Sequence, residues 1–294
     1  MAGGGQRVNA PVRPHDHQWF YPTAFLSWGQ EEYDAVQRVV ASGRFTMGPE
    51  VEAFESEFAA YLGRRRVVMV NSGSSANLVA AIALNPPQNL SVAVPALAWG
   101  TTYSPFALLR SRFYLMDCDP DTWNVSKETM RVADIVVLCP ILGNPAGLSE
   151  VSGMAIAGGR TVLEVACESL GAEIDGRRAG TFGHISTFSF YFSHQLSAIE
   201  GGAIATDDDE LADTCIILRD HGLTRGLKHN RTIAEEFEFL HMGFNFRPVE
   251  INAAVAREQL RKFPQIAHNR VHNFGYFWFL AKDIDEIDHP VSKG

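Results

Sequence analysis

The stretch STFSFYFSHQLSAIEGG, residues 186–202, begins as a strand and ends in a turn closed by two glycines. Phe188, Phe190 and Phe192 alternate with polar side chains, and this period of two predicts a half-buried strand. The alternation stops before His194, which would lie at the strand's end. Histidine suits a proton carrier because its unperturbed pKa is about 6.5. Taken alone, the stretch is better explained by a surface histidine after a buried strand.

Composition bounds the class of protein. The chain has 294 residues, of which 46% are hydrophobic and 20% charged, as in a globular protein with a sizeable core. A net charge of −9 argues against nucleic acid and anionic membranes as partners. The cysteines are widely spaced and form no C-x-x-C pattern, which argues against a disulfide framework or a metal site. No run approaches about 20 apolar residues, so we expect a cytoplasmic protein.

Short apolar runs alternate with helical patterns through most of the chain. We expect strands at 67–70, 92–95, 113–116, 135–138, 161–164 and 203–206. We expect helices at 29–42, 49–62, 76–83, 101–109 and 209–219, followed by two helices at 248–262 and 264–284. This alternation predicts an α/β fold with a mostly parallel sheet sandwiched by helices. Residues 1–20 are expected to form a flexible N-terminal arm.

The segment NSGSSAN, residues 71–77, lies between an apolar strand and a helix. Backbone N–H groups at a helix N-terminus, beside a glycine and hydroxyls, can bind an anion. The segment is neither a Walker A loop nor G-x-G-x-x-G, so a phosphate bound there would not be that of ATP or NAD. The alternative is an ordinary N-cap formed by Ser74 or Ser75. Trp99, after the next strand, could stack on a flat heterocycle or pack in the core.

Nine short motifs occur in one order between about Tyr21 and Leu260: FTMG, NSGSSAN, PALAWGTTY, DPDTWNV, CESLGA, GTFG, FSFYFSH…EGG, RDHG and GFNFRP. Together they resemble the sugar aminotransferase family of fold-type I pyridoxal-phosphate enzymes. The resemblance implies a large cofactor-binding α/β domain over residues 21–262 and a helix over 263–294 that leads into a small C-terminal domain. Most of that domain has no counterpart in this sequence, so Phe274 to Phe279 are expected to be partly uncovered.

The resemblance also implies roles for individual residues. Gly73, Ser74 and Ser189 match the positions that cradle the cofactor phosphate. Trp99 matches the ring that stacks on the pyridine, and Glu168 matches the residue that faces the cofactor 3-hydroxyl.

His194 stands where aminotransferases of this family carry the lysine that binds the cofactor covalently. A histidine there is similar to the sugar 3-dehydratases that use pyridoxamine phosphate, with the strongest likeness to the subgroup acting on GDP-4-keto-6-deoxy-D-mannose in O-antigen deoxysugar biosynthesis. This likeness implies pyridoxamine or pyridoxal 5′-phosphate as cofactor, a GDP-linked sugar as substrate, and His194 as proton carrier assisted by His221. Asn245 matches the residue that reaches the phosphate in a neighbouring subunit, which implies a homodimer with a shared site.

Val165 departs from the family pattern, which has an aspartate at this position, three residues before Glu168. That aspartate pairs with the pyridine nitrogen and keeps the ring an electron sink. Glu164 cannot replace it, because neighbouring side chains of a strand point to opposite faces. Two alternatives to the 3-dehydratase stay open. One is a 4-keto-sugar aminotransferase, which the missing lysine opposes, and the other is a catalytically weakened or silent homologue that acts as a binding or assembly partner.

Overall fold

The computed structural model describes residues 26–84, 90–227, 232, 237–282 and 284, and the arm expected at 1–20 lies outside them. The helices are α1 (Gln30–Ser42), α2 (Pro49–Leu62), α3 (Gly73–Ala83), α4 (Gly100–Leu108), η1 (Ile141–Gly143), α5 (Leu148–Ala157), α6 (Asp209–Arg219), η2 (Thr224–Gly226) and α8 (Glu250–Ala281). The strands are β1 (Arg66–Val70), β2 (Ser91–Pro95), β3 (Arg112–Met116), β4 (Ile135–Leu138), β5 (Thr161–Val165), β6 (Glu173–Ile174), β7 (Arg177–Arg178), β8 (Ile185–Ser189) and β9 (Gly202–Thr206).

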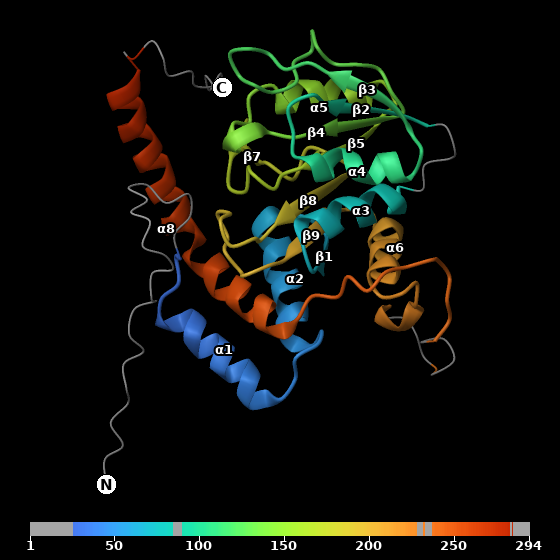
Figure 1. Ribbon diagram of the computed structural model, residues 1–294, viewed down its shortest axis with the longest axis vertical. Helices are drawn as coiled ribbons and strands as arrows, with labels where there is room; N and C mark the ends of the chain where they lie inside the picture. Colours follow the sequence, from blue (N-terminus) through green and yellow to red (C-terminus); the bar gives the residue numbers. More distant parts are fainter. Residues whose placement is uncertain (1–25, 85–89, 228–231, 233–236, 283, 285–294) are drawn as a thin grey trace, which may run out of the picture.

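Seven of these strands form one sheet in the order β1-β9-β8-β5-β4-β2-β3 (Figure 1). Strands β8, β5, β4, β2 and β3 run parallel, and β9 lies antiparallel between β1 and β8. The predicted mostly parallel α/β sheet is therefore confirmed. The carboxyl ends of β1, β2, β4, β5 and β8 meet at one edge, where ligands of such sheets commonly bind.

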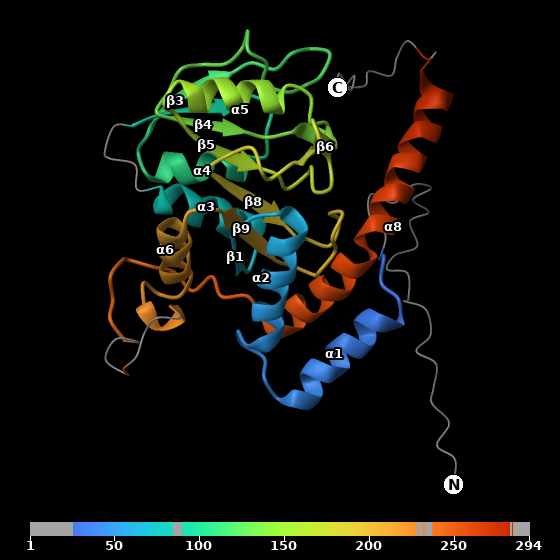
Figure 2. The same cartoon turned by 180° about the vertical axis from the view of Figure 1, so that it is seen from behind.

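Helices cover both faces of the sheet, as the views from the two sides show (Figures 1 and 2). On one face, α3, α4 and α6 bury a cluster that includes Val70, Val94 and Val165. On the other face, α2 and the first half of α8 bury Phe58 and Phe188, and α5 covers the strands further along. Alternate residues of each strand thus enter different cores, as expected for strands buried on both faces.

The C-terminal part differs from the sequence prediction, which placed two helices on either side of Pro264. The structure has one helix, α8, of 32 residues with Pro264 inside it. Proline removes one backbone donor and usually kinks or ends a helix. Packing of the first half against α1 and α2, with Phe263 only 2% exposed, holds the helix through this position.

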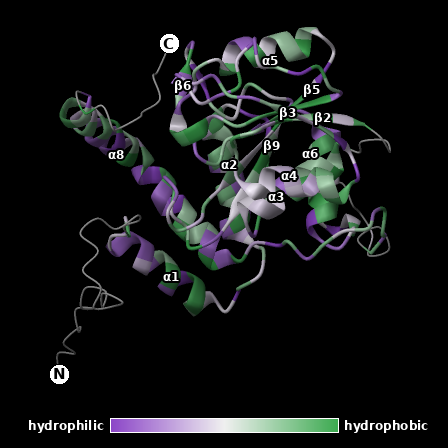
Figure 3. Cartoon of the chain, turned by 45° about the horizontal axis from the view of Figure 1, so that its top comes forward, coloured by the Kyte–Doolittle hydropathy of each residue, from purple (hydrophilic) through white to green (hydrophobic). Residues whose placement is uncertain are grey.

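The outer half of α8 projects away from the layered body in both ribbon views (Figures 1 and 2). In Figure 3, the green of hydrophobic residues is seen toward the far end of α8. Phe274, Phe277 and Phe279 are 53%, 49% and 67% exposed, so the expected uncovered aromatic surface is present within the described residues. No helix among the residues that the structure describes is both long and apolar enough to cross a membrane.

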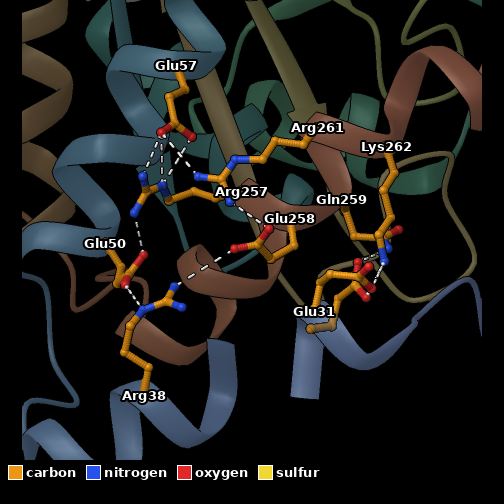
Figure 4. A network of polar contacts seen from close by, with 10 residues as sticks. Glu31, Arg38, Glu50, Glu57, Arg257, Glu258, Gln259, Arg261 and Lys262 are labelled. Carbon is orange, nitrogen blue, oxygen red and sulfur yellow. Dashed lines mark hydrogen bonds and ion pairs between the residues drawn. The ribbon is translucent and has the colours of Figure 1, made fainter. Parts of the chain in front are cut away.

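Ion pairs fix the first half of α8 to α1 and α2 (Figure 4). Arg257 of α8 lies 2.7 Å from carboxylates of Glu50 and Glu57, both on α2. Lys262 of α8 lies 2.7 Å from Glu32 of α1, whose side chain is fully buried. A charge buried as deeply as that of Glu32 must be paired, because removing its partner leaves it desolvated and uncompensated. These pairs hold the base of α8 against the body.

Two local predictions need correction. Helix α3 begins at Gly73 instead of Ala76, and its cap is Ser72, whose side chain accepts from the Ser75 N–H at 3.1 Å. The alternative interpretation, an N-cap formed by Ser74 or Ser75, named the wrong residues, and Gly73 and Ser74 lie in the first turn. Strand β8 ends at Ser189, earlier than the alternation up to Phe192 indicated. Helix α5 and the short β6–β7 hairpin were missed.

Candidate functional site

A cavity of about 570 Å³ lies at the edge of the sheet where the parallel strands end. Its volume is in the range of sites that hold cofactors and small ligands. Six of the eight predicted site residues line it: Gly73, Ser74, Trp99, Glu168, Ser189 and His194. Strand ends and helix starts far apart in sequence therefore bring these side chains together.

The first turn of α3 meets the end of β8 at very short range. A Cβ atom added to Gly73 would lie 2.6 Å from the Cβ of Ser189, and one added to Gly202 would lie 2.4 Å from the backbone of Ser72. Only glycine allows these approaches. The free N–H groups of the helix start and the hydroxyls of Ser74 and Ser189 then line one end of the cavity, an arrangement suited to an anion.

Trp99 immediately precedes α4 and is 73% exposed, so it does not pack in the core. The interpretation as a core residue was wrong. Hydrogen bonds hold the first turn of α4, next to Trp99, against α3 and β8. Asn77 of α3 donates to the Thr101 carbonyl at 3.2 Å and accepts from Thr187 of β8 at 2.6 Å. A flat ligand can reach the indole from the cavity.

Glu168 lies in the loop after β5 and lines the cavity. Its carboxylate accepts from the Leu142 N–H at 2.9 Å, and its carbonyl accepts from the Gln195 side chain. Leu142 has a φ of 52°, a left-handed conformation that is uncommon for a bulky residue. These bonds fix the carboxylate in the cavity wall.

His194 follows β8 and lines the same cavity, with its backbone N–H donating to the Tyr191 carbonyl at 2.9 Å. Burial lowers the pKa of the His194 imidazole, Glu168 opposes this shift, and Arg270 adds to it. The imidazole is therefore neutral at physiological pH and able to accept a proton. Arg270 comes from α8, 76 positions further along the chain, and also lines the cavity. The sequence offered no signal for it, since it looks like any charged residue on a helix surface.

Val165, at the end of β5, lines the cavity and is 4% exposed. Glu164 points to the opposite face, as predicted. Its fully buried carboxylate accepts from the backbone N–H groups of Gly180, Phe182 and Gly183. Burial raises the pKa of Glu164, and these bonds work against that shift. Glu164 therefore supports a loop and has no access to the cavity.

His221 and Asn245 do not line the cavity of this chain. His221 has a φ of 62°, and its Nε2 lies 3.9 Å from the Asp220 carboxylate. Asn245 is exposed and pairs with Asp220 through an isolated β-bridge. Asp220 itself is engaged by Arg225 at 2.5 Å. The catalytic assistance assigned to His221 and the contact of Asn245 with a second subunit stay predictions.

Two buried polar atoms at the cavity, Oγ1 of Thr102 and Oε1 of Gln195, have no hydrogen-bond partner. Buried polar atoms normally have one, so the cavity wall suits a polar ligand. The residues that the structure describes contain no cluster of three His, Cys, Asp or Glu placed to hold a metal.

Comparisons with known proteins place this geometry in context. The GDP-4-keto-6-deoxy-D-mannose 3-dehydratase of Escherichia coli O55:H7 is 37% identical, over 93% of this chain and 76% of the relative. The enzyme of the same name from Yersinia pseudotuberculosis is 35% identical, over 93% of this chain and 75% of its own. A crystal structure of GDP-4-keto-6-deoxymannose-3-dehydratase with bound GDP-perosamine superposes with a TM-score of 0.90 at 35% identity, covering 93% of this chain and 76% of that one. The E. coli enzyme with bound hydrated PLP gives a TM-score of 0.89, with the same identity and coverage.

These likenesses each cover 93% of this chain. The model of the DegT/DnrJ/EryC1/StrS aminotransferase family matches residues 27–292. The chain therefore belongs to the DegT/DnrJ/EryC1/StrS aminotransferase family.

Proposed function

We propose that this chain catalyses the 3-dehydration of a nucleotide-linked 4-keto-6-deoxy sugar, with pyridoxamine or pyridoxal 5′-phosphate as cofactor. The GDP-linked sugar is the proposed substrate, because two relatives above 30% identity are named for it. The observation that carries the proposal is His194, a neutral imidazole in the cavity wall beside Glu168. Of the lysines that the structure describes, none lines this cavity.

The cavity residues fit the phosphate and the ring face of the cofactor, and they do not fit its ring nitrogen. Gly73 leaves a cradle that a Cβ would fill, next to the hydroxyls of Ser74 and Ser189. Trp99 offers an exposed indole. At the position where the family has an acid for the ring nitrogen, Val165 offers only methyl groups.

The chain's own residues support elimination over amino transfer. When bound, pyridoxamine phosphate supplies an amine for the 4-keto group and a ring that spreads negative charge. One imidazole nitrogen of His194 accepts a proton and, as imidazolium, returns it to the departing 3-hydroxyl. Glu168 would face the cofactor 3-hydroxyl, and the α3 N-terminus would hold the phosphate. Histidine does this without becoming covalently attached to the cofactor.

The assembly belongs to the same proposal. Asn245 is exposed on this chain, as required of a side chain that reaches into a neighbouring subunit. We therefore propose a cytoplasmic homodimer with shared active sites, with His221 as an assisting residue and a place in the deoxysugar biosynthesis of O-antigens.

A second candidate function is a weakened or silent homologue that binds ligand or an assembly partner without turnover. Val165 is the observation that favours it, since losing one preorganised electrostatic partner costs on the order of 10²–10³ in rate. An aminotransferase is a weaker candidate because the cavity lacks a lysine among its lining residues.

The test incubates the purified protein with excess pyridoxamine phosphate and GDP-4-keto-6-deoxymannose. The expected product is lighter by one oxygen atom, and it forms together with equal amounts of ammonia and pyridoxal phosphate. His194→Asn should bind the cofactor and form no product.

Borohydride trapping with pyridoxal phosphate supplies the control. The wild type should show no lysine adduct, whereas His194→Lys should be labelled at the new lysine. A lysine adduct in the wild type would overturn the dehydratase proposal. Cofactor binding without product would leave the silent homologue.

A further inference from the structure

The floor of the cavity at the end of β5 is apolar and uncharged. Val165 lines it, together with Cys139, which directly follows β4, and Cys167, which lies two residues after Val165. Burial, with the nearby charge of Glu168 adding to it, raises the pKa of the Cys167 thiol to about 12 and that of Cys139 well above its usual value. Both thiols are therefore neutral. Behind the floor, Val165 and Cys139 pack into the apolar core beneath α3 and α4.

The carboxylates near this floor are engaged elsewhere. Glu164, the neighbour of Val165, is buried on the other face and bonded to three backbone N–H groups. Glu168 accepts from the Leu142 N–H in the loop beyond the strand. Glu200, the other lining carboxylate, is exposed at the rim. The one arginine that lines the cavity is Arg270, and it adds positive charge.

A cation placed on such a floor would have no carboxylate beneath it at Val165, and the Glu168 carboxylate in the loop beyond the strand is held by the Leu142 N–H. Burial without an opposite charge disfavours the charged form of a base and lowers its pKa. A pyridine nitrogen that faces Val165 would therefore lose its proton on binding, whereas an aspartate there would hold the proton in place.

We propose that Val165 makes this cavity a site for pyridine rings whose nitrogen is unprotonated. The proposal rests on the proposed function, in that the cavity takes pyridoxal or pyridoxamine phosphate. It names Val165 as a specificity-determining residue, because it sets which form of the ring binds. The site accordingly does not distinguish a pyridine from a ring with carbon in place of the nitrogen.

The direct test is ¹⁵N NMR of pyridoxal phosphate labelled at the ring nitrogen and bound to the protein at neutral pH. The wild type should give the chemical shift of a neutral pyridine. Val165→Asp should move it to that of a pyridinium. Val165→Thr, which keeps the shape without adding charge, is the matched control and should keep the neutral shift.

Competition with 1-deazapyridoxal phosphate gives a second readout that needs no variant. Wild type and Val165→Thr should bind the analogue and the parent within about twofold, whereas Val165→Asp should prefer the parent by roughly tenfold or more, the equivalent of about 1.4 kcal/mol. Should Val165→Asp fail to fold, the wild-type shift and affinity ratio still decide the question.

The outcomes separate this inference from the proposed function. A pyridinium shift in the wild type, or a strong preference for the parent ring, overturns the inference and leaves the dehydratase proposal standing. If neither ring binds, both the inference and the proposed function are overturned. A neutral bound ring without turnover supports the inference and removes the enzymatic function.

Discussion

A Cβ atom on Gly73 would lie 2.6 Å from the Cβ of Ser189, so the first turn of α3 rests directly on the end of β8. This contact positions the helix N-terminus at the cavity. It also explains why glycine stands at a helical position, where it costs about 1 kcal/mol relative to alanine.

We predict that Gly73→Ala separates these two elements. The unfolding free energy should fall by about 1–3 kcal/mol, as for other overpacked sites, and cofactor affinity should fall by at least roughly tenfold. Urea unfolding and absorbance titration measure the two effects. Gly153→Ala is the control, because a Cβ there meets nothing within 4 Å in the middle of α5. Unchanged cofactor binding in Gly73→Ala would show that the helix start does not hold the phosphate.

Trp99 should affect binding far more than stability. Since its side chain is 73% exposed, Trp99→Ala should change the unfolding free energy by less than about 0.5 kcal/mol. Loss of ring stacking, worth about 0.5–1.5 kcal/mol, should weaken cofactor binding roughly 2- to 10-fold. Trp99→Phe retains a stacking ring and should recover most of the affinity. Equal losses in both variants would argue against stacking.

The sequence predicted the sheet well because residues 67–70 of β1, 92–94 of β2 and 135–138 of β4 are short apolar runs, which is what burial on both faces requires. It placed the start of α3 too late, because Ser72, Ser74 and Ser75 are all good caps and only the approach of β8 selects Ser72. Pro264 indicated a break between two helices, but packing against α1 and α2 keeps α8 continuous through it.

The candidate site was predicted in part from the resemblance of its motifs to a known family. Glu168 and His194 follow parallel strands and Ser189 ends one, so their arrival at one edge agrees with the chain order. Arg270 reaches the cavity only because α8 runs on past Pro264, and no local pattern encodes that path.

Glu250, in the first turn of α8, should be important for stability. Its carboxylate is 2% exposed and accepts from the backbone N–H groups of Gly48, Glu50 and Val51 at the start of α2. Glu250→Gln places a donor against these donors and should lower the unfolding free energy by about 1–3 kcal/mol. Glu52→Gln, which alters an exposed carboxyl in the first turn of α2, should change it by less than about 0.5 kcal/mol. An equally small change in the unfolding free energy for Glu250→Gln would mean that water takes over the hydrogen bonds to these N–H groups.

Stability should fall as the pH drops below neutral, because two histidines are held neutral in the folded chain. Burial lowers the pKa of His184, with Arg64 adding to the shift, and its Nδ1 accepts from the Val162 N–H at 3.0 Å. The pKa of His194 is lowered as well.

Between the unfolded value of about 6.5 and these lower folded values, the unfolded chain binds more protons, so acidification favours unfolding. Urea unfolding at a series of pH values from about 7.5 to 5 should show this loss. His184→Asn should make the dependence shallower because the amide oxygen accepts the Val162 bond without titrating. His194→Asn should also reduce it, and the double variant should reduce it further. A slope unchanged in the double variant would place the acid sensitivity in other groups.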